Sequence, residues 1–324
     1  MNIDAKSLRI VFMGTPEFAV ASLRTLTEEG YNIVGVITAP DKPAGRGQKM
    51  SASAVKQFAL EANLNVLQPE RLKDPFFLDA LNKLRPDLQI VVAFRMLPEL
   101  VWQMPRLGTF NLHASLLPQY RGAAPINWAV MNGEAETGLT TFMLTHEIDT
   151  GNILLQERHP IYDSDSAGDL YARLMNAGAS LVVETVNRLA AGTIVPALQK
   201  VTDPSALRPA PKLHRDILRI NWNKSAVETR NHIRGLSPFP GAWTLMSDAG
   251  SGTIVQELKI YQAELVGLPL ASPGSIDTDG KSYLHIACSD GWLSVKELQL
   301  AGKRRMLITE VLRGFSGFSG SCFI

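Results

Sequence analysis

The chain contains 324 residues, of which 45% are hydrophobic and 19% are charged, and its formal net charge is +1. This composition excludes an intrinsically disordered chain, and the length exceeds what one hydrophobic core usually supports, so we predict two domains. There is no basic segment followed by an apolar leader and no run of about 18 apolar residues, which predicts a cytoplasmic protein without a membrane segment.

The N-terminal part alternates short apolar runs with helical patterns. Strands are predicted at Leu8–Phe12, Ile33–Ile37 and Leu88–Ala93. A helical pattern follows the first strand and ends at Gly30, and a second helix is predicted at Pro75–Leu84. Strands that alternate with helices favour an α/β domain in which helices cover both faces of a parallel sheet.

The turn between the first strand and the first helix contains Gly14 but no GxGxxG pattern. A dinucleotide site needs further glycines there, so that the pyrophosphate can approach the helix N-terminus. Nicotinamide binding is therefore not expected.

The same alternation continues further along the chain. Strands are predicted at Thr109–Leu112 and Leu139–Leu144, and helices at Pro125–Met131 and Ala167–Ala191. Four prolines between Val195 and Pro211 predict a linker over about residues 195–211. We place the domain boundary near residue 207, with a catalytic domain at 1–207 and a second domain at 208–324.

The second domain is rich in short β-like segments separated by Gly, Asp and Ser clusters, after a helical pattern at Ala226–Ile233. This pattern favours a small β-barrel. From residue 208 onward there are 14 Lys and Arg against 10 Asp and Glu, a net charge of +4, and the remainder carries −3. So mild a surplus fits nucleic-acid contact but also an ordinary solvated surface. The β segments are Ala242–Leu245, Thr253–Tyr261, Tyr283–Ala287 and Leu293–Leu298.

Three cations, Lys42, Arg46 and Lys49, lie among prolines and glycines in the segment APDKPAGRGQKM. This segment is too irregular for a helix or a strand, and we expect an exposed loop. Such a loop can contact phosphate groups, although a solvated loop without a partner is an equally good interpretation of this segment alone.

Asn111 and His113 lie at the end of a predicted strand and alternate with Phe110 and Leu112. The two-residue period of a strand places both polar side chains on one face. Ligands of parallel α/β sheets bind at the carboxyl ends of the strands, so an amide and an imidazole here predict a polar site.

Asp149 follows another predicted strand, in the polar turn HEIDTG. An isolated Asp-Thr-Gly is more often a turn former than a catalytic group. If Asp149 meets His113 in space, however, the two become an acid–base pair beside an amide.

Several other chemistries lack their motifs. GxSxG, HExxH and the P-loop pattern are missing, and the two cysteines, Cys288 and Cys322, have no CxxC spacing. Covalent catalysis, a metal site and a disulfide framework are therefore not predicted. Direct transfer between two bound substrates remains.

The stretch FNLHASLLPQYRGAAPINWAV, followed by HEIDTG, resembles the formyltransferase family that uses 10-formyltetrahydrofolate as formyl donor. The resemblance implies that Asn111, His113 and Asp149 form the catalytic trio. It also implies that the SLLP residues lie beside the folate, and that no metal takes part. The SLLP residues are Ser115, Leu116, Leu117 and Pro118.

A PDKPAGRG-like loop, RGAAPI and APKL are typical of the family's branch that acts on initiator methionyl-tRNA. The resemblance then implies a Rossmann-like domain followed by an OB-like barrel that contacts tRNA, in a monomer. Phe94 and Arg95 depart from the Tyr-Gly that is common in related sequences, which bears on the folate pocket. The residues implied in tRNA binding are Lys42, Arg46, Lys49, Lys212, Lys303, Arg304 and Arg305.

In the expected mechanism, Asn111 and His113 stabilise the oxyanion of a tetrahedral species, and Asp149 orients the imidazole and moves the proton. Two alternatives stay open. A formyltransferase for another amine, such as glycinamide ribonucleotide or an amino sugar, would share the trio. A non-catalytic RNA-binding module would use the α/β domain as a scaffold.

Overall fold

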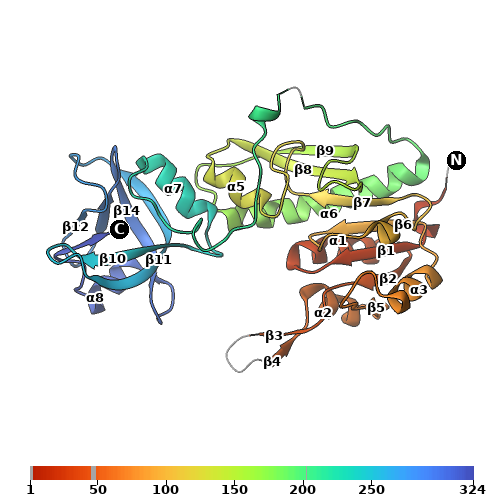
Figure 1. Cartoon of the computed structure of the whole chain (residues 1–324), viewed down its shortest axis with the longest axis horizontal. Coiled ribbons are helices and arrows are strands. Elements are labelled where there is room, and N and C mark those ends of the chain that lie inside the picture. Colours follow the sequence, from red (N-terminus) through yellow and green to blue (C-terminus); the bar gives the residue numbers. More distant parts are fainter. Residues whose placement is uncertain (1–2, 45–48, 202) are drawn as a thin grey trace. The chain divides into compact units, whose positions relative to one another are not determined.

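A computed structural model describes residues 3–44, 49–201 and 203–324 (Figure 1). The chain forms two compact units. Unit 1 contains Met1–Gly122, Thr137–Pro160 and Tyr171–Pro209, and unit 2 contains Ala123–Glu136, Ile161–Leu170 and Ala210–Ile324. The chain therefore contributes short internal segments to unit 2 before it enters that unit for good. The domain boundary near residue 207 stays a prediction.

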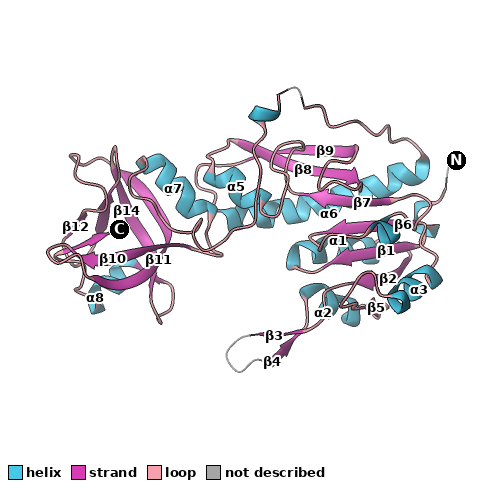
Figure 2. Ribbon diagram, viewed as in Figure 1, coloured by secondary structure: helices cyan, strands magenta, loops and turns pink. Residues whose placement is uncertain are grey.

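Unit 1 is built on a seven-stranded sheet in the order β5-β2-β1-β6-β7-β8-β9 (Figure 2). The first five strands in this order pair in parallel, as the alternating pattern predicts. The strands are β1 (Ile10–Gly14), β2 (Ile33–Ile37), β5 (Val66–Leu67), β6 (Leu88–Val92), β7 (Thr109–His113), β8 (Glu136–Met143) and β9 (Ile153–Pro160).

Strand β8 pairs antiparallel with β7, so the predicted parallel sheet is extended by an antiparallel strand on this side. Parallel neighbours need a crossover connection, usually a helix packed on the sheet. Helix α5 (Pro125–Met131) is the helix between β7 and β8, and it belongs to unit 2. The chain therefore returns to the sheet of unit 1 without a covering crossover.

Alternate residues of the central strands face different helices. Val11 and Met13 of β1 and Val91 of β6 pack in one buried cluster with residues of α3 and α4. On the other face, Leu112 of β7 lies against Gly178, where an added Cβ would come within 2.8 Å of the leucine side chain. The helices of unit 1 are α1 (Glu17–Glu28), α2 (Ala54–Glu61), α3 (Pro75–Lys83), α4 (Glu99–Trp102) and most of α6 (Ala167–Ala191).

Unit 2 contains an antiparallel sheet in the order β12-β13-β14-β11-β10-β16. A bridge between Ser275 and Cys322 joins the ends of this order, so the sheet curls into a nearly closed barrel, as predicted. The helices of unit 2 include α5, α7 (Ala226–Gly235) and α8 (Ile308–Gly314). Its strands are β10 (Ala242–Asp248), β11 (Ile254–Val266), β12 (Ile276–Thr278), β13 (Leu284–Ala287), β14 (Trp292–Leu300), β15 (Met306–Leu307) and β16 (Ser321–Phe323).

The barrel is filled by large side chains, among them Trp222, Leu258, Leu298 and Phe318. Helix α7 contributes Ile233 to this core, and its N-terminus carries a capping box formed by Ser225 and Glu228. Along the first half of β10, buried residues alternate with partly buried ones, as in a strand with one face on the core.

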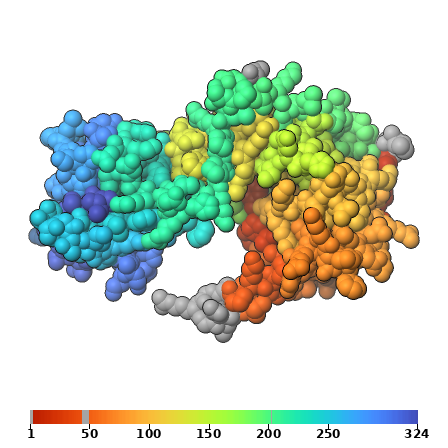
Figure 3. Space-filling model, in the orientation of Figure 1, coloured from red at the N-terminus to blue at the C-terminus, as the bar shows by residue number. Residues whose placement is uncertain are grey.

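The segment after α6 runs over the outside of unit 1, in green in Figure 3. Apart from a bridge between Ile153 and Ala197 and the 3-10 turn η2 (Pro204–Ala206), its described residues up to 209 form no regular structure. Val195 and Leu198 are 87% and 76% exposed, so apolar burial does not hold this segment in place.

Replacing Phe110 by alanine should destabilise unit 1 by about 3–5 kcal/mol, because its ring is fully buried in β7 and alanine leaves a cavity. Phe76→Ala is the matched control, since that ring is 87% exposed on α3. Urea unfolding followed by fluorescence and circular dichroism measures both variants. Similar midpoints for the two variants would contradict the burial assigned to Phe110.

Candidate active site

The site lies at the carboxyl end of β7. Thr109 of this strand donates a hydrogen bond to the carbonyl of Trp102 in α4, so its side of the strand faces away from α6. Asn111 and His113 share this side by the two-residue period, while Phe110 and Leu112 point to the opposite face. The packing of β7 therefore directs both polar side chains to one place.

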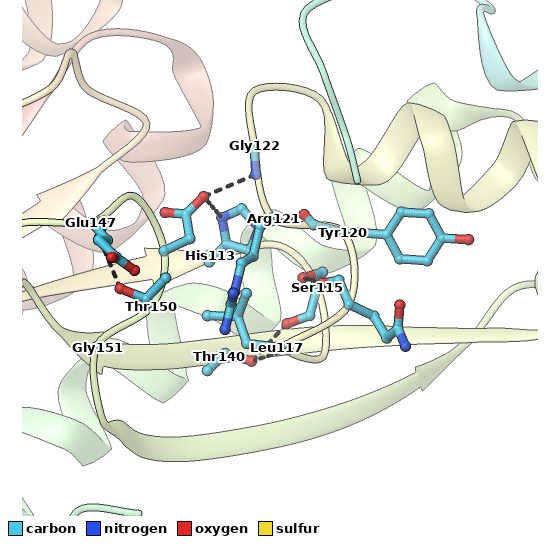
Figure 4. A network of polar contacts seen from close by, with 12 residues as sticks. His113, Ser115, Leu117, Tyr120, Arg121, Gly122, Thr140, Glu147, Thr150 and Gly151 are labelled. Carbon is cyan, nitrogen blue, oxygen red and sulfur yellow. Dashed lines mark hydrogen bonds and ion pairs between the residues drawn. The ribbon is translucent and has the colours of Figure 1, made fainter. Parts of the chain in front are cut away.

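The His113 ring is held on two sides (Figure 4). Its Nε2 lies 2.9 Å from the carbonyl oxygen of Tyr120, and since a carbonyl can only accept, Nε2 carries the proton and donates. Its Nδ1 lies 4.0 Å from Oδ2 of Asp149. Both side chains are largely buried, at 7% and 11% exposed. The ring also packs edge-on against Phe142.

Asp149 lies in the turn between β8 and β9, so the structure brings it to His113 as the sequence analysis required of an acid–base pair. Its φ of 56° is in the left-handed region, which aspartate tolerates better than most residues. Oδ2 also accepts a hydrogen bond of 2.9 Å from the N–H of Gly122. Asp149 is thus more than a turn former.

Asn111 carries a buried oxygen, Oδ1, that has no hydrogen-bond partner among the described residues. An unsatisfied buried amide oxygen costs about 1–3 kcal/mol, so native proteins retain one where a ligand or water can satisfy it. Together with the buried imidazole and carboxylate, it makes this end of β7 suited to a polar ligand.

The SLLP loop directly after β7 is held from below by Thr140 of β8. The Thr140 hydroxyl donates to the carbonyl of Ser115 at 2.6 Å and accepts from the N–H of Leu117 at 3.2 Å (Figure 4). Gln156 of β9 adds hydrogen bonds of 2.9 Å to the Leu117 carbonyl and 3.0 Å to the Thr140 hydroxyl. These contacts fix the backbone beside the trio.

Of the four predicted folate residues, Ser115 and Leu117 are buried, and Leu116 and Pro118 are half-buried. The Ser115 hydroxyl donates to the carbonyl of Gln119 at 2.6 Å, so this side chain shapes the loop. Their role in binding folate stays a prediction.

The groups that hold the trio in place were not predicted from the sequence. Two are backbone atoms, the carbonyl of Tyr120 and the N–H of Gly122, and no residue type marks them in a sequence. A third is Gln199, whose amide donates to the carbonyl of Asp149 at 2.8 Å. Gln199 lies within the predicted linker, where no pattern distinguishes it.

The departure at Phe94 and Arg95 has a local explanation. The Arg95 guanidinium donates to the carbonyl of Glu70 at 2.8 Å and also to that of Pro69, and it lies over the Phe94 ring. Partial burial lowers the pKa of Arg95. The arginine therefore joins the end of β6 to the segment after β5.

The predicted tRNA residues fall in both units. In unit 1, Lys42 is exposed in β3 (Lys42–Ala44), which pairs antiparallel with β4 (Lys49–Ser51). The prediction that the whole basic segment is irregular is therefore wrong at its ends, because Pro43 is tolerated in a two-stranded edge pair. Arg46 and the Lys49 side chain lie outside the described residues.

In unit 2, Lys212 and all of Lys303, Arg304 and Arg305 are exposed. Arg304 lies 3.7 Å from Glu310, and Arg305 pairs with Glu297 in addition to covering the Tyr261 ring. Acidic neighbours thus offset part of the positive charge of this turn. Contact of these cations with tRNA stays a prediction.

Across residues 3–44, 49–201 and 203–324, no three His, Cys, Asp or Glu side chains gather in a way that could hold a metal ion. Within the same ranges, no helix combines the length and the apolar character that crossing a membrane requires.

Comparison with known families matches both parts of the chain. Residues 8–186 match the model of the formyl transferase family, and residues 212–316 match that of the formyl transferase C-terminal domain. A methionyl-tRNA formyltransferase of Parabacteroides distasonis is 58% identical over 96% of both chains. One of Bacteroides thetaiotaomicron is 56% identical over the same shares, and one of Flavobacterium johnsoniae is 49% identical over 96% of this chain and 97% of its own.

Solved structures share the fold at lower identity. An N-formyltransferase of Helicobacter canadensis, in complex with folinic acid and dTDP-3-aminofucose, superimposes with a TM-score of 0.63 at 20% identity, covering 92% of this chain and 100% of its own. HypX of Aquifex aeolicus in complex with tetrahydrofolic acid gives a TM-score of 0.63 at 19% identity. The superposition with HypX covers 94% of this chain and 47% of HypX, so this chain spans about half the length of HypX.

Replacing Thr140 by valine should destabilise the protein by about 1–3 kcal/mol, because the SLLP backbone loses its hydroxyl partner at a buried position. Thr25→Val is the control, since its hydroxyl donates to the carbonyl of Ala21 within helix α1. Chemical denaturation gives the free energy of unfolding of both variants. An equal loss in the two would show that the Thr140 hydroxyl has no special part in holding the loop.

Proposed function

The chain belongs to the formyl transferase family, and we propose that it transfers the formyl group of 10-formyltetrahydrofolate to the amino group of initiator methionyl-tRNA. The observation that carries this proposal is the 58% identity to a methionyl-tRNA formyltransferase over 96% of both chains. The matched region includes unit 2 as well as the unit with the site. The acceptor is therefore inferred from the whole chain, because other members of such folds formylate other amines.

The reaction exchanges one C–N bond for another. The methionyl amine attacks the formyl carbon, the carbonyl oxygen gains negative charge, and the bond from that carbon to N10 of the folate then breaks. A proton leaves the amine and N10 receives one, so atoms and charge balance. The protein must supply donors for the oxygen and a route for the proton.

Asn111 supplies an amide donor for the developing oxyanion, since its Nδ2 lies at the same end of β7 as the imidazole. His113 has already committed Nε2–H to Tyr120, which leaves Nδ1 as the nitrogen for the substrate. This nitrogen lies 4.0 Å from Oδ2 of the Asp149 carboxylate. His113 then donates to the oxyanion through Nδ1.

Asp149 has a second task. Its Oδ2 serves Gly122 and His113, which leaves Oδ1 free of partners among the described residues to take the proton of the attacking amine. The proton then passes to N10 directly or through water. In this proposal the reaction takes place in the cytoplasm and the protein acts as a monomer. All three residues of the trio lie in unit 1, so the trio itself needs no residue of a second copy.

The deciding experiment incubates the purified protein with 10-formyltetrahydrofolate and charged initiator tRNA and measures formylmethionine. Glycinamide ribonucleotide and an amino-sugar nucleotide serve as parallel acceptors. We expect product from the tRNA alone. Formylation of a small acceptor in place of the tRNA, or binding of tRNA without product, would overturn the proposed function.

Asp149→Asn should lower kcat by about 100-fold or more, while the fold is kept because asparagine can still accept from Gly122. Asn111→Ala should cost about 10²- to 10³-fold, as expected when one oxyanion donor is removed. The control is Asp79→Asn, an exposed carboxylate on α3 that pairs with Lys83. If Asp149→Asn retained activity near that of the control, the proton-handling role would be wrong.

Arg46→Ala should raise KM for tRNA and reduce the slope of its logarithmic salt dependence by about one, because one phosphate contact is lost. This expectation rests on the basic sequence of the segment between β3 and β4. Lys83→Ala, on the exposed face of α3, is the control. An unchanged KM and salt slope in the Arg46 variant would rule out the contact.

A further inference from the structure

Gln199 points inward from a segment whose other side chains are exposed. The residues around it, from Val195 to Val201, are all exposed, and Val195 and Leu198 are 87% and 76% exposed. Gln199 alone among these seven is half-buried. An exposed valine and leucine beside an inward-facing amide reverse the usual order. The polar contacts of Gln199 therefore hold the segment here together with the backbone bridge between Ile153 and Ala197.

Both ends of the Gln199 amide are used. Nε2 donates to the carbonyl of Asp149 at 2.8 Å and to that of Gly151 at 2.9 Å. Oε1 accepts from Nη2 and Nε of Arg121 at 2.7 and 3.2 Å. A glutamine amide has two N–H donors and two acceptor lone pairs, so its full hydrogen-bonding capacity is used here.

These contacts join the two loops of the site. Arg121 lies in the loop that presents the Tyr120 carbonyl and the Gly122 N–H, and Asp149 lies in the turn between β8 and β9. The other side of that turn is packed tightly, because a Cβ at Gly151 would come within 1.7 Å of the Met143 carbonyl oxygen. Gln199 thus connects the backbone of Asp149 to the loop that contains Gly122, the residue whose N–H the Asp149 side chain binds.

We propose that Gln199 is a positioning residue for formyl transfer, which sets the Asp149 carboxylate relative to His113 and Gly122. The inference rests on the proposed function, since it concerns the same site. Asp149 is held in a left-handed conformation at φ 56°, and such a conformation persists where surrounding contacts impose it. The two donors from Gln199, at Asp149 and Gly151, are contacts of this kind.

The chemistry of the two arms makes the amide difficult to replace. The Asp149 and Gly151 carbonyls need donors, and the Arg121 guanidinium needs an acceptor. Glutamate keeps the acceptor for Arg121 with almost the same shape, but it presents oxygen to both carbonyls. Gln199→Glu therefore separates the arm that holds the Asp149 turn from the arm that holds Arg121.

The test compares Gln199→Ala, Gln199→Glu and the control Leu198→Ala, the neighbouring exposed position, in steady-state formylation of methionyl-tRNA. We expect kcat to fall by about 10- to 100-fold in both Gln199 variants, because small misplacements of a catalytic group have effects of this size. KM for tRNA and for 10-formyltetrahydrofolate should stay within about twofold of wild type, and Leu198→Ala should match wild type. Thermal unfolding checks that each variant is folded.

Three results would overturn the proposal. One is wild-type kcat in either Gln199 variant, and another is a loss of kcat in Leu198→Ala as large as that in Gln199→Ala. The third is a rise in KM without a change in kcat. If Gln199→Ala proves unstable, the isosteric Gln199→Glu decides. Wild-type protein in the same assay tests the proposed function separately, because its failure to formylate methionyl-tRNA would concern that function and not Gln199.

Discussion

The alternation of side chains along β7 is the constraint on which the site depends. Phe110 and Leu112 are buried on one face, and this burial leaves Asn111 and His113 no choice but the other. A shift of one residue in the pairing of β7 would exchange the two faces. Parallel pairing with β6 and antiparallel pairing with β8 fix this register from both sides. The hydrophobic core therefore determines where the catalytic chemistry can take place.

Side-chain periodicity explains why the outline of the molecule could be predicted from the sequence. The predicted strand at Ile33–Ile37 and helices at Pro125–Met131 and Ala167–Ala191 have the observed bounds. The first of these helices begins with Pro125 and the second is followed by Gly192, and such residues mark helix ends in a sequence. The direction in which neighbouring strands pair could not be predicted from this periodicity. Whether β8 runs parallel or antiparallel to β7 depends on where the chain between them packs, and no local pattern records that.

In the site, too, local periodicity predicts some features, and others depend on the fold of the whole unit. Asn111 and His113 follow from one strand, but their meeting with Asp149 joins residues that are far apart in sequence, and only the resemblance to a family predicted it. The groups that hold these side chains are still harder to predict, because the Tyr120 carbonyl and the Gly122 N–H are backbone groups. Almost every residue of a chain carries the same two groups. Backbone donors and acceptors acquire a function through the fold alone.

The segment that follows α6 also contacts the loops of the candidate site. Besides Gln199, the Arg208 carbonyl accepts from the N–H of Tyr120 at 2.7 Å, and the Arg208 N–H donates to the Gln119 side chain at 2.8 Å. The loop that orients His113 is thus tied to the connecting segment at two points about ten residues apart in sequence. Polar contacts of this segment thus help to fix the backbone beside His113 and Asp149.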